Sequence, residues 1–224
     1  QQNIETFSVG FDSVDEEEGD EFKYSDVIAN HFQTKHHQIR VDAQRTLSNL
    51  DACIGAMSEP MVSHDCIGFY LLSEEVAKSV KVVQSGQGAD EVFAGYHWYP
   101  PMMKSTDPVN DYTKVMFDRD HFEYAEAVDR RFVSENFSHR FVADHFRNAG
   151  ADRPIDKALR LDTSIMLVDD PVKRVDNMTM AWGLEARVPF LDHELVEFAG
   201  KIPAEFKVRG GGKYILKEAA REVI

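Results

Sequence analysis

The first hundred residues alternate between short strand-like and longer helix-like patterns of hydrophobic positions. TFSVGF at residues 6–11 alternates and carries β-branched and aromatic side chains, which predicts a buried strand. HQIRV at residues 37–41 predicts a second, shorter strand. Between them, hydrophobic side chains recur at helical spacing over residues 24–34, and a further helix is expected over residues 44–57, before Pro60.

A third strand is expected at residues 81–84, where KVVQ follows a helical pattern over residues 69–80. This strand leads directly into SGQG at residues 85–88. The order strand, helix, strand, helix, strand predicts an α/β fold with a parallel sheet and helical crossovers. We expect KVVQ in the middle of this sheet and SGQG as a loop at its C-terminal end.

Beyond Pro101 the helical period dominates, at residues 120–132, 157–167 and 193–201, and no convincing strand follows. We therefore expect an α/β layer over residues 1–100 and a mainly helical layer over residues 101–224.

Composition excludes several classes of function. The formal net charge of -14 disfavours nucleic acid as a partner, because phosphates would be repelled over most of the surface. No stretch approaches the roughly 18 apolar residues of a membrane span. The start has neither an initiator Met nor a signal-peptide pattern and reads as an interior cut. Cys53 and Cys66 lack CxxC spacing, which favours reduced thiols in a cytoplasmic protein.

The glycine-rich segment after the third strand is the strongest local sign of chemistry. Its glycines let backbone N–H groups approach a phosphate, at the edge where open α/β sheets bind ligands. Asp90 offers a hard oxygen ligand for the magnesium that accompanies a nucleotide. A tight strand-to-helix turn, with Asp90 in the first helical turn, explains the same spacing equally well.

Four segments, in order, resemble the asparagine synthetase family. SGQGADEVFAGY at residues 85–96 is similar to the family's SGEGADELFGGY. DNMTMA at residues 176–181, with LEARVPFLD at residues 184–192, is similar to DRMSMA and LEARVPFLD. KYILKEA at residues 213–219 resembles the KYLLREA helix, and TFSVG at residues 6–10 resembles the second strand. Together these segments span nearly the whole chain.

The resemblance implies an adenine nucleotide alpha hydrolase-like fold, of the N-type ATP pyrophosphatases. It also implies that a substrate carboxylate attacks the α-phosphate of ATP with Mg²⁺, giving an acyl-adenylate and pyrophosphate. Ammonia, released from glutamine by a separate N-terminal glutaminase domain, would then displace AMP. By matching position, the nucleotide-binding residues would be Val9, Gly10, Ser85, Gly86, Gln87 and Asp90. Asp90 would also bind the metal, and the catalytic residues would be Lys213, which neutralises developing charge, and Glu91.

Two departures from the family pattern bear on activity. The family's first phosphate loop, SGGLDSS, does not occur in the sequence, and we expect it just before Gln1 together with a first strand. Without it the chain should not catalyse adenylation, and an exposed sheet edge could pair with a second copy as a homodimer. Gln87 stands where the family has Glu, so an acid–base role at that position is in doubt.

The segment MSEPMVSHDC at residues 57–66 looks more like the N-acetylglutaminylglutamine amidotransferases, which amidate a small peptide-like carboxylate. His64 and Asp65 are then candidates for substrate contact, although an ordinary loop hydrogen-bond pair fits as well. A true asparagine synthetase acting on aspartate remains an alternative, as does a non-catalytic binding or scaffold chain.

Other chemically suggestive residues have structural interpretations. A buried ion pair of Glu185 with Arg187, and Asp192 as a helix N-cap, are favoured over catalytic roles. His36 and His37 should point to opposite faces of a strand and so not share a metal. The side chains of two methionines, Met178 and Met180, are expected in the core.

Overall fold

The computed structural model describes residues 4–11, 22–61 and 63–223. The chain forms two compact units. The first comprises residues 1–86, 169–189 and 222–224, and the second comprises residues 87–168 and 190–221. Residues 169–189 thus return to the first unit, so the division is not a single change near residue 100.

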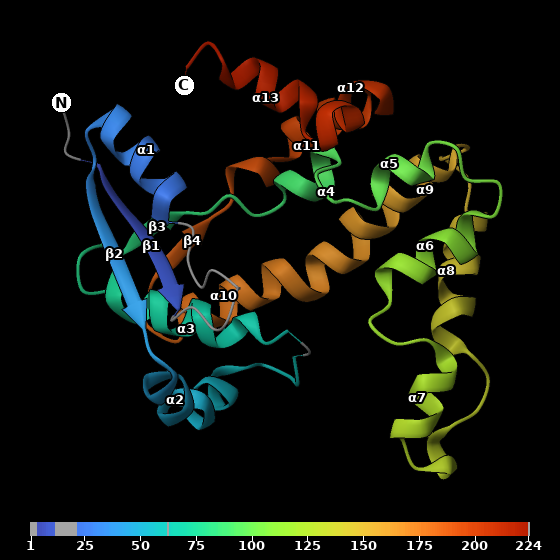
Figure 1. The fold of residues 1–224 in the computed structure, drawn as a ribbon, viewed down its shortest axis with the longest axis horizontal. Helices are drawn as coiled ribbons and strands as arrows, with labels where there is room; N and C mark the ends of the chain where they lie inside the picture. Colours follow the sequence, from blue (N-terminus) through green and yellow to red (C-terminus); the bar gives the residue numbers. More distant parts are fainter. Residues whose placement is uncertain (1–3, 12–21, 62, 224) are drawn as a thin grey trace. The chain divides into compact units, whose positions relative to one another are not determined.

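Two parallel strands and the helix between them open the first unit (Figure 1). Strand β1 (Glu5–Phe11) pairs with β2 (Lys35–Val41), and Val9 lies opposite Ile39. Helix α1 (Phe22–Phe32) connects them, as the hydrophobic spacing predicts. Both expected strands are confirmed, and so is the parallel crossover.

A second pair of parallel strands lies in the same unit. Strand β3 (Val82–Gln84) pairs with β4 (Glu185–Arg187), and the backbone N–H of Ser85 donates to the carbonyl of Arg187 at 2.8 Å. The expectation of no strand beyond residue 101 is therefore wrong. Strand β4 has only three residues, two of them charged, which is too short for a period-2 pattern to be recognised. Its extended conformation is stabilised by pairing with β3. Among the described strands β3 has β4 as its one neighbour, so its expected central position is not seen.

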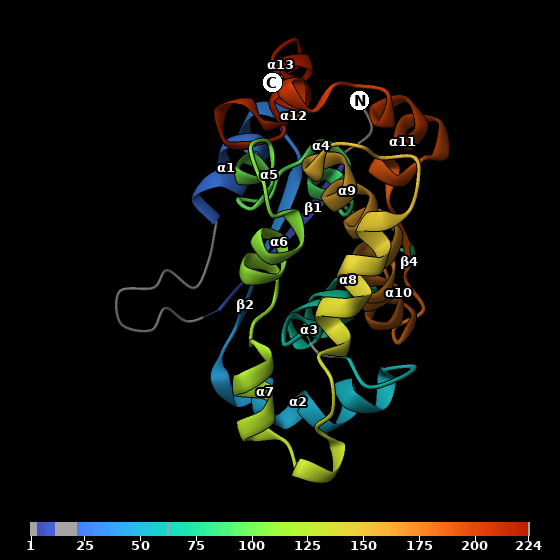
Figure 2. The same ribbon diagram turned by 90° about the vertical axis from the view of Figure 1, so that its right-hand side faces the viewer.

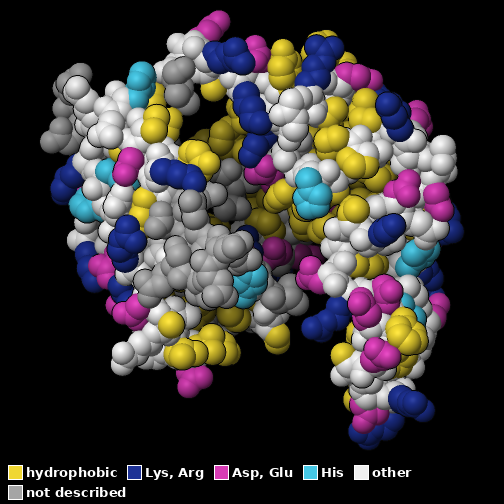
Figure 3. Space-filling view, viewed as in Figure 1, with side chains coloured by type: hydrophobic (Ala, Val, Ile, Leu, Met, Phe, Trp, Pro, Cys, Tyr) yellow, Lys and Arg dark blue, Asp and Glu magenta, His cyan; other side chains and the backbone are white. Residues whose placement is uncertain are grey.

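Three helices cover these strands. They are α2 (Ala43–Ala56), α3 (Asp65–Val76) and α10 (Lys173–Met180), and they enclose a core of Ile39, Val41, Cys53, Cys66, Tyr70, Leu71 and Met178. Both cysteines are free and buried, and burial raises the pKa of the Cys53 thiol to about 11. Met180 is 53% exposed, so its expected core position is wrong. Figure 3 shows hydrophobic side chains over α2, where Leu47, Leu50 and Ile54 are exposed.

A cavity of about 720 Å³ separates β1 from β3 inside the first unit. Its walls include residues 4–7, the whole of β3 and residues of α3 and α10. In the part of the chain that the structure describes, no strand bridges the β1–β2 pair and the β3–β4 pair. The four described strands therefore form two separate two-stranded sheets that line the same cavity.

The second unit is helical in its described residues. Its helices are α4 (Ala89–Phe93), α5 (Tyr99–Met102), α6 (Pro108–Met116), α7 (His121–Ala127), α8 (Phe137–Arg147), α9 (Pro154–Leu161), α11 (His193–Gly200), α12 (Ala204–Val208) and α13 (Tyr214–Ala220). Figure 2 shows α6 beside α8, and π-helical turns at Asp162–Met166 continue α9. The expected helices near residues 120–132, 157–167 and 193–201 are confirmed in α7, α9 and α11.

A buried carboxyl group organises the core of this unit. Asp162 accepts hydrogen bonds from Trp98 Nε1 at 3.1 Å, from the Tyr99 hydroxyl at 2.6 Å and from the Tyr112 hydroxyl. The Asp162 side chain is fully buried, and desolvation raises its pKa. Donors from Trp98 at the N-cap of α5, from α5 itself and from α6 thus converge on the C-cap of α9.

We expect Asp162→Ala to lower the free energy of unfolding by about 3 kcal/mol or more, because three buried donors each lose their acceptor at about 1–3 kcal/mol. Tyr112→Phe removes a single donor and should cost about 1 kcal/mol. Urea denaturation followed by circular dichroism measures both values. Equal losses for the two variants would contradict a shared acceptor at Asp162.

Candidate active site

The glycine loop lies where the sequence predicts it, directly after the C-terminal end of β3. Gly88 has a φ of 89°, in the left-handed region, and a Cβ there would lie 2.1 Å from the Leu191 side chain. Position 88 therefore requires glycine for its backbone and for its close approach to Leu191. Gly88 precedes the first turn of α4, whose residues include Asp90 and Glu91.

Asp90 and Lys213 form an ion pair within the second unit. Lys213 Nζ lies 2.7 Å from Asp90 Oδ1, and each side chain is about one-third exposed, at 31% and 32%. Lys213 has a φ of 52°, and its backbone N–H donates to the Phe93 carbonyl at 3.1 Å. The end of α4 therefore holds the backbone of Lys213, and the structure brings together two residues that are 123 positions apart in the sequence.

Gly95 and Gly212 give this ion pair its room. A Cβ at Gly95 would lie 1.8 Å from Asp90 Oδ1, and a Cβ at Gly212 would lie 2.3 Å from the Ala94 carbonyl oxygen. Side chains at either position would force the pair or its supporting backbone to move. These close approaches are the physical reason for glycine at both positions.

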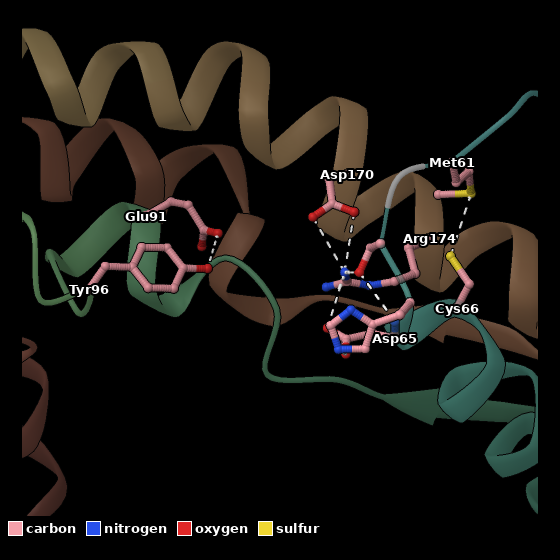
Figure 4. Close-up of polar contacts among 9 residues, drawn as sticks. Met61, Asp65, Cys66, Glu91, Tyr96, Asp170 and Arg174 are labelled. Carbon is pink, nitrogen blue, oxygen red and sulfur yellow. Dashed lines mark hydrogen bonds and ion pairs between the residues drawn. The ribbon is translucent and has the colours of Figure 1, made fainter. Parts of the chain in front are cut away.

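Glu91, the neighbour of Asp90, has a different environment. Its side chain is 1% exposed, and Oε1 accepts a hydrogen bond from the Tyr96 hydroxyl at 2.7 Å (Figure 4). Burial raises the pKa of Glu91, and burial together with the Glu91 contact raises the pKa of Tyr96. Glu91 is therefore a buried, hydrogen-bonded carboxyl group, and the expected catalytic role for it stays a prediction.

In the first unit, the end of β1 and the start of α3 line one apolar cavity. The cavity has a volume of about 460 Å³, and its walls include Val9, Phe11, His64, Asp65 and Phe69. His64 Nε2 lies 3.5 Å from Asp65 Oδ1, and the His64 side chain is 98% exposed. The structure thus places one residue expected for the nucleotide beside two expected for the substrate. Ser85 and Gly86 line the other cavity of this unit, between β1 and β3.

Arg174 joins this region, although no pattern in the sequence selects it. Its Nη1 lies 2.5 Å from Ser63 Oγ, 3.4 Å from Asp65 Oδ2 and 3.2 Å from Asp170 Oδ1 (Figure 4). The side chain is 9% exposed, and the buried Nε has no hydrogen-bond partner among the described residues.

Comparison with known proteins decides the family. The asparagine synthase family model matches residues 1–224. The chain belongs to the asparagine synthase family. Its fold is that of the adenine nucleotide alpha hydrolases, with parallel strands and helices as expected.

Curated relatives in the asparagine synthase family resemble nearly all of the chain. Asparagine synthetase [glutamine-hydrolyzing] 1 of Bacillus subtilis (strain 168) is 27% identical, over 99% of this chain and 40% of its own length. The putative asparagine synthetase of Mycobacterium tuberculosis (strain ATCC 25618 / H37Rv) is 26% identical over 98% of this chain and 38% of its own. The Bos taurus asparagine synthetase is 25% identical over 97% and 30%. The chain thus spans at most about two-fifths of these relatives.

Asp90 suits the metal chemistry that the asparagine synthase family implies. Among the described residues, no three His, Cys, Asp or Glu side chains gather as a metal-binding group. A single carboxylate is nevertheless a common protein contribution to Mg²⁺, whose other ligands are nucleotide phosphates and water. The position of Asp90 in the first turn after the glycine loop fits that kind of ion.

The residues with structural interpretations behave only in part as expected. Asp192 caps α11, accepting from the backbone N–H of Glu194 at 3.0 Å. Glu185 and Arg187 lie 4.0 Å apart with both side chains more than half exposed, so the expected buried ion pair is wrong. Alternate residues of β4 share a face, and that face is open to solvent.

No described helix is long and apolar enough to cross a membrane.

Proposed function

We propose that this chain is part of an ATP-dependent, amide-forming ligase that adenylates a substrate carboxylate and transfers ammonia to it. The observation that carries the proposal is the Asp90–Lys213 ion pair. It lies at α4, the helix that follows the glycine loop, in a chain of the asparagine synthase family. The printed names of the relatives, glutamine-hydrolyzing asparagine synthetases, support glutamine as the ammonia source through a glutaminase domain.

The proposed roles follow from charge and position. Lys213 stabilises negative charge that develops on the phosphates when the acyl-adenylate forms, as a fixed cation needs no reorganisation. The backbone N–H of Ser85 pairs with the Arg187 carbonyl, so the N–H groups of Gly86 and Gln87 are the ones that donate to phosphate oxygens at the C-terminal end of β3. Asp90 orients Lys213 and is the residue that would hold Mg²⁺, which neutralises phosphate charge when ATP is bound.

The acceptor is proposed to be a small peptide-like carboxylate that contacts the cavity at the end of β1. Arg174 lies at the base of the segment that carries His64 and Asp65, and its guanidinium is shared among Ser63, Asp65 and Asp170. A guanidinium that contacts Ser63 and Asp65 from a neighbouring helix is suited to holding their loop in one position. We expect that positioning to select the acceptor.

A further parallel strand, supplied from outside these 224 residues, is proposed to fill the gap between β1 and β3. Among the described residues, β1 and β3 each have one neighbouring strand, to which they are parallel, and both strands line the same cavity. The loop after such a strand would carry the family's first phosphate-binding segment to the same edge as residues 85–88.

The 224-residue chain by itself is expected to bind Mg-ATP in the millimolar range or more weakly. The first phosphate-binding segment would supply two or three charge-assisted hydrogen bonds to the phosphates, at about 1.5–3 kcal/mol each. Without them the affinity for Mg-ATP falls by several powers of ten, since about 1.4 kcal/mol corresponds to a tenfold change. Calorimetric titration is the measurement. A micromolar dissociation constant would show that residues 85–90 suffice, and that the placement of the phosphates is wrong.

The acceptor is tested on the natural-length gene product, supplied with Mg-ATP, glutamine and either N-acetylglutaminylglutamine or aspartate. We expect amide formation on the peptide. Arg174→Lys, which keeps the charge but loses the planar fork, should raise the KM for the acceptor and leave the KM for ATP unchanged. Turnover with aspartate alone would identify an asparagine synthetase instead. Turnover with neither acceptor would favour a binding or scaffold role.

A further inference from the structure

A polar cavity of about 650 Å³ lies within the second unit, apart from the Asp90–Lys213 ion pair. Its walls come from the N-terminal end of α9, from α12 and from the buried side of α4. The charged residues facing it are Glu91, Asp152, Arg153, Asp156, Arg160 and Lys201, together with Lys207. No step of the proposed ligase reaction uses this cavity.

Lys207 is the unusual member of this set. Its side chain is 5% exposed, and within the described residues its ammonium group has neither a hydrogen bond nor an ion pair. Asp156 is the carboxylate whose charge acts on it, without direct contact. A largely buried lysine without an acceptor costs free energy, so lysines are rarely buried to this extent unless paired. Desolvation accordingly lowers the pKa of Lys207.

Other donors face the same space. Helix α9 has eight residues, and its N-cap residue, Arg153, makes no side-chain capping hydrogen bond. Pro154 has no N–H, so the first-turn N–H groups left for another acceptor are those of Ile155 and Asp156. The Arg160 guanidinium contacts the carbonyls of residues 145, 148 and 149, and its buried Nε has no partner among the described residues. Arg153, Asp156 and Arg160 line the same cavity as Lys207.

The acidic residues of the wall only partly offset this positive charge. Glu91 already accepts from the Tyr96 hydroxyl, and burial raises the pKa of its carboxyl group. Arg153 pairs with Glu205 at 2.9 Å, which leaves Asp152 and Asp156 as the unpaired acids. Lys207, Arg160 and Lys201 have no carboxylate within ion-pair distance among the described residues.

We propose that this cavity binds a small oxyanion, a carboxylate or a phosphate group, with Lys207 as its principal cation. The anion accepts hydrogen bonds from the Lys207 ammonium group and from the first-turn N–H groups of α9. Because Glu91 adjoins Asp90 on α4, an occupied cavity borders the helix that holds the Asp90–Lys213 ion pair.

Calorimetric titrations of the natural-length protein with inorganic phosphate and with succinate test the proposal and separate the two ligand sources. Saturable binding of at least one anion is expected, weakened at least tenfold in Lys207→Met and unchanged in Lys114→Met, an exposed lysine of α6. Affinity should fall as the pH rises through the lowered pKa of Lys207, because the neutral amine no longer attracts an anion.

Lys207→Met should fold, because methionine replaces an unpaired buried charge with an apolar side chain of similar length. A second measurement needs no variant: in protein labelled with 13C-lysine, the pKa of Lys207 should rise when the anion is added. Absence of saturable binding of both anions would overturn the proposal. So would equal affinity in Lys207→Met, or a Lys207 pKa that the bound anion leaves unchanged.

Discussion

Asp90→Asn is expected to lower carboxylate-dependent ATP–pyrophosphate exchange by about 100-fold or more in the natural-length protein. The substitution keeps the shape of the side chain but removes the charge that pairs with Lys213 at 2.7 Å and that would hold Mg²⁺. Losing several kcal/mol of transition-state stabilisation by the metal lowers the exchange rate by several powers of ten, since about 1.4 kcal/mol corresponds to a tenfold change. Exchange of labelled pyrophosphate into ATP is the measurement.

Asp118→Asn serves as the matched control, since Asp118 is an exposed residue of the same unit. It should keep full exchange activity. Both variants should unfold within about 1 kcal/mol of the parent, because an ion pair that is one-third exposed contributes little to stability. Exchange by Asp90→Asn within a few-fold of the parent would remove Asp90 from the metal and phosphate site.

Gly95→Ala is expected to reduce the same exchange activity by a comparable factor, although position 95 carries no chemistry. The new Cβ would lie 1.8 Å from Asp90 Oδ1 and 2.7 Å from its Cγ, so the carboxylate must swing away from Lys213. The clash is mainly with the end of a flexible side chain, so the fold should survive with a loss of about 1 kcal/mol. Activity and urea denaturation measured on one preparation separate the two effects.

Gly200→Ala is the control for glycine replacement, because a Cβ at Gly200, in the last turn of α11, meets nothing within 4 Å. It should retain activity and be at least as stable as the parent. Full activity of Gly95→Ala would show that the observed position of the Asp90 carboxylate is not required for catalysis.

Periodicity predicted the parts of the fold whose residues carry their own signal. β1 and β2 alternate in sequence, and α1 repeats hydrophobic residues at helical spacing, so their positions followed from local pattern alone. β4 could not be found in this way, because three residues are too few for a period and the strand is stabilised by pairing with β3. The return of residues 169–189 to the first unit is likewise a matter of tertiary packing.

The candidate site likewise contains residues that a local sequence pattern reveals and residues that depend on tertiary packing. The glycine loop and Asp90 are visible in one short motif, and the family resemblance added Lys213, which the structure brings to Asp90. The burial of Glu91 against Tyr96 depends on how α4 packs, which no spacing reveals. Arg174 matters through its contacts with Ser63 and Asp65, which precede it by 111 and 109 positions in the chain. Only coordinates could therefore select it.

The products made from ATP test the central claim most directly. The natural-length protein, given Mg-ATP, glutamine and a carboxylate acceptor labelled with 18O, should release AMP and pyrophosphate in equal amounts. One 18O atom should appear in the AMP, because the carboxylate oxygen bonds to the α-phosphate before ammonia displaces it. Release of ADP and phosphate, or AMP without the label, would contradict an acyl-adenylate and with it the proposed function.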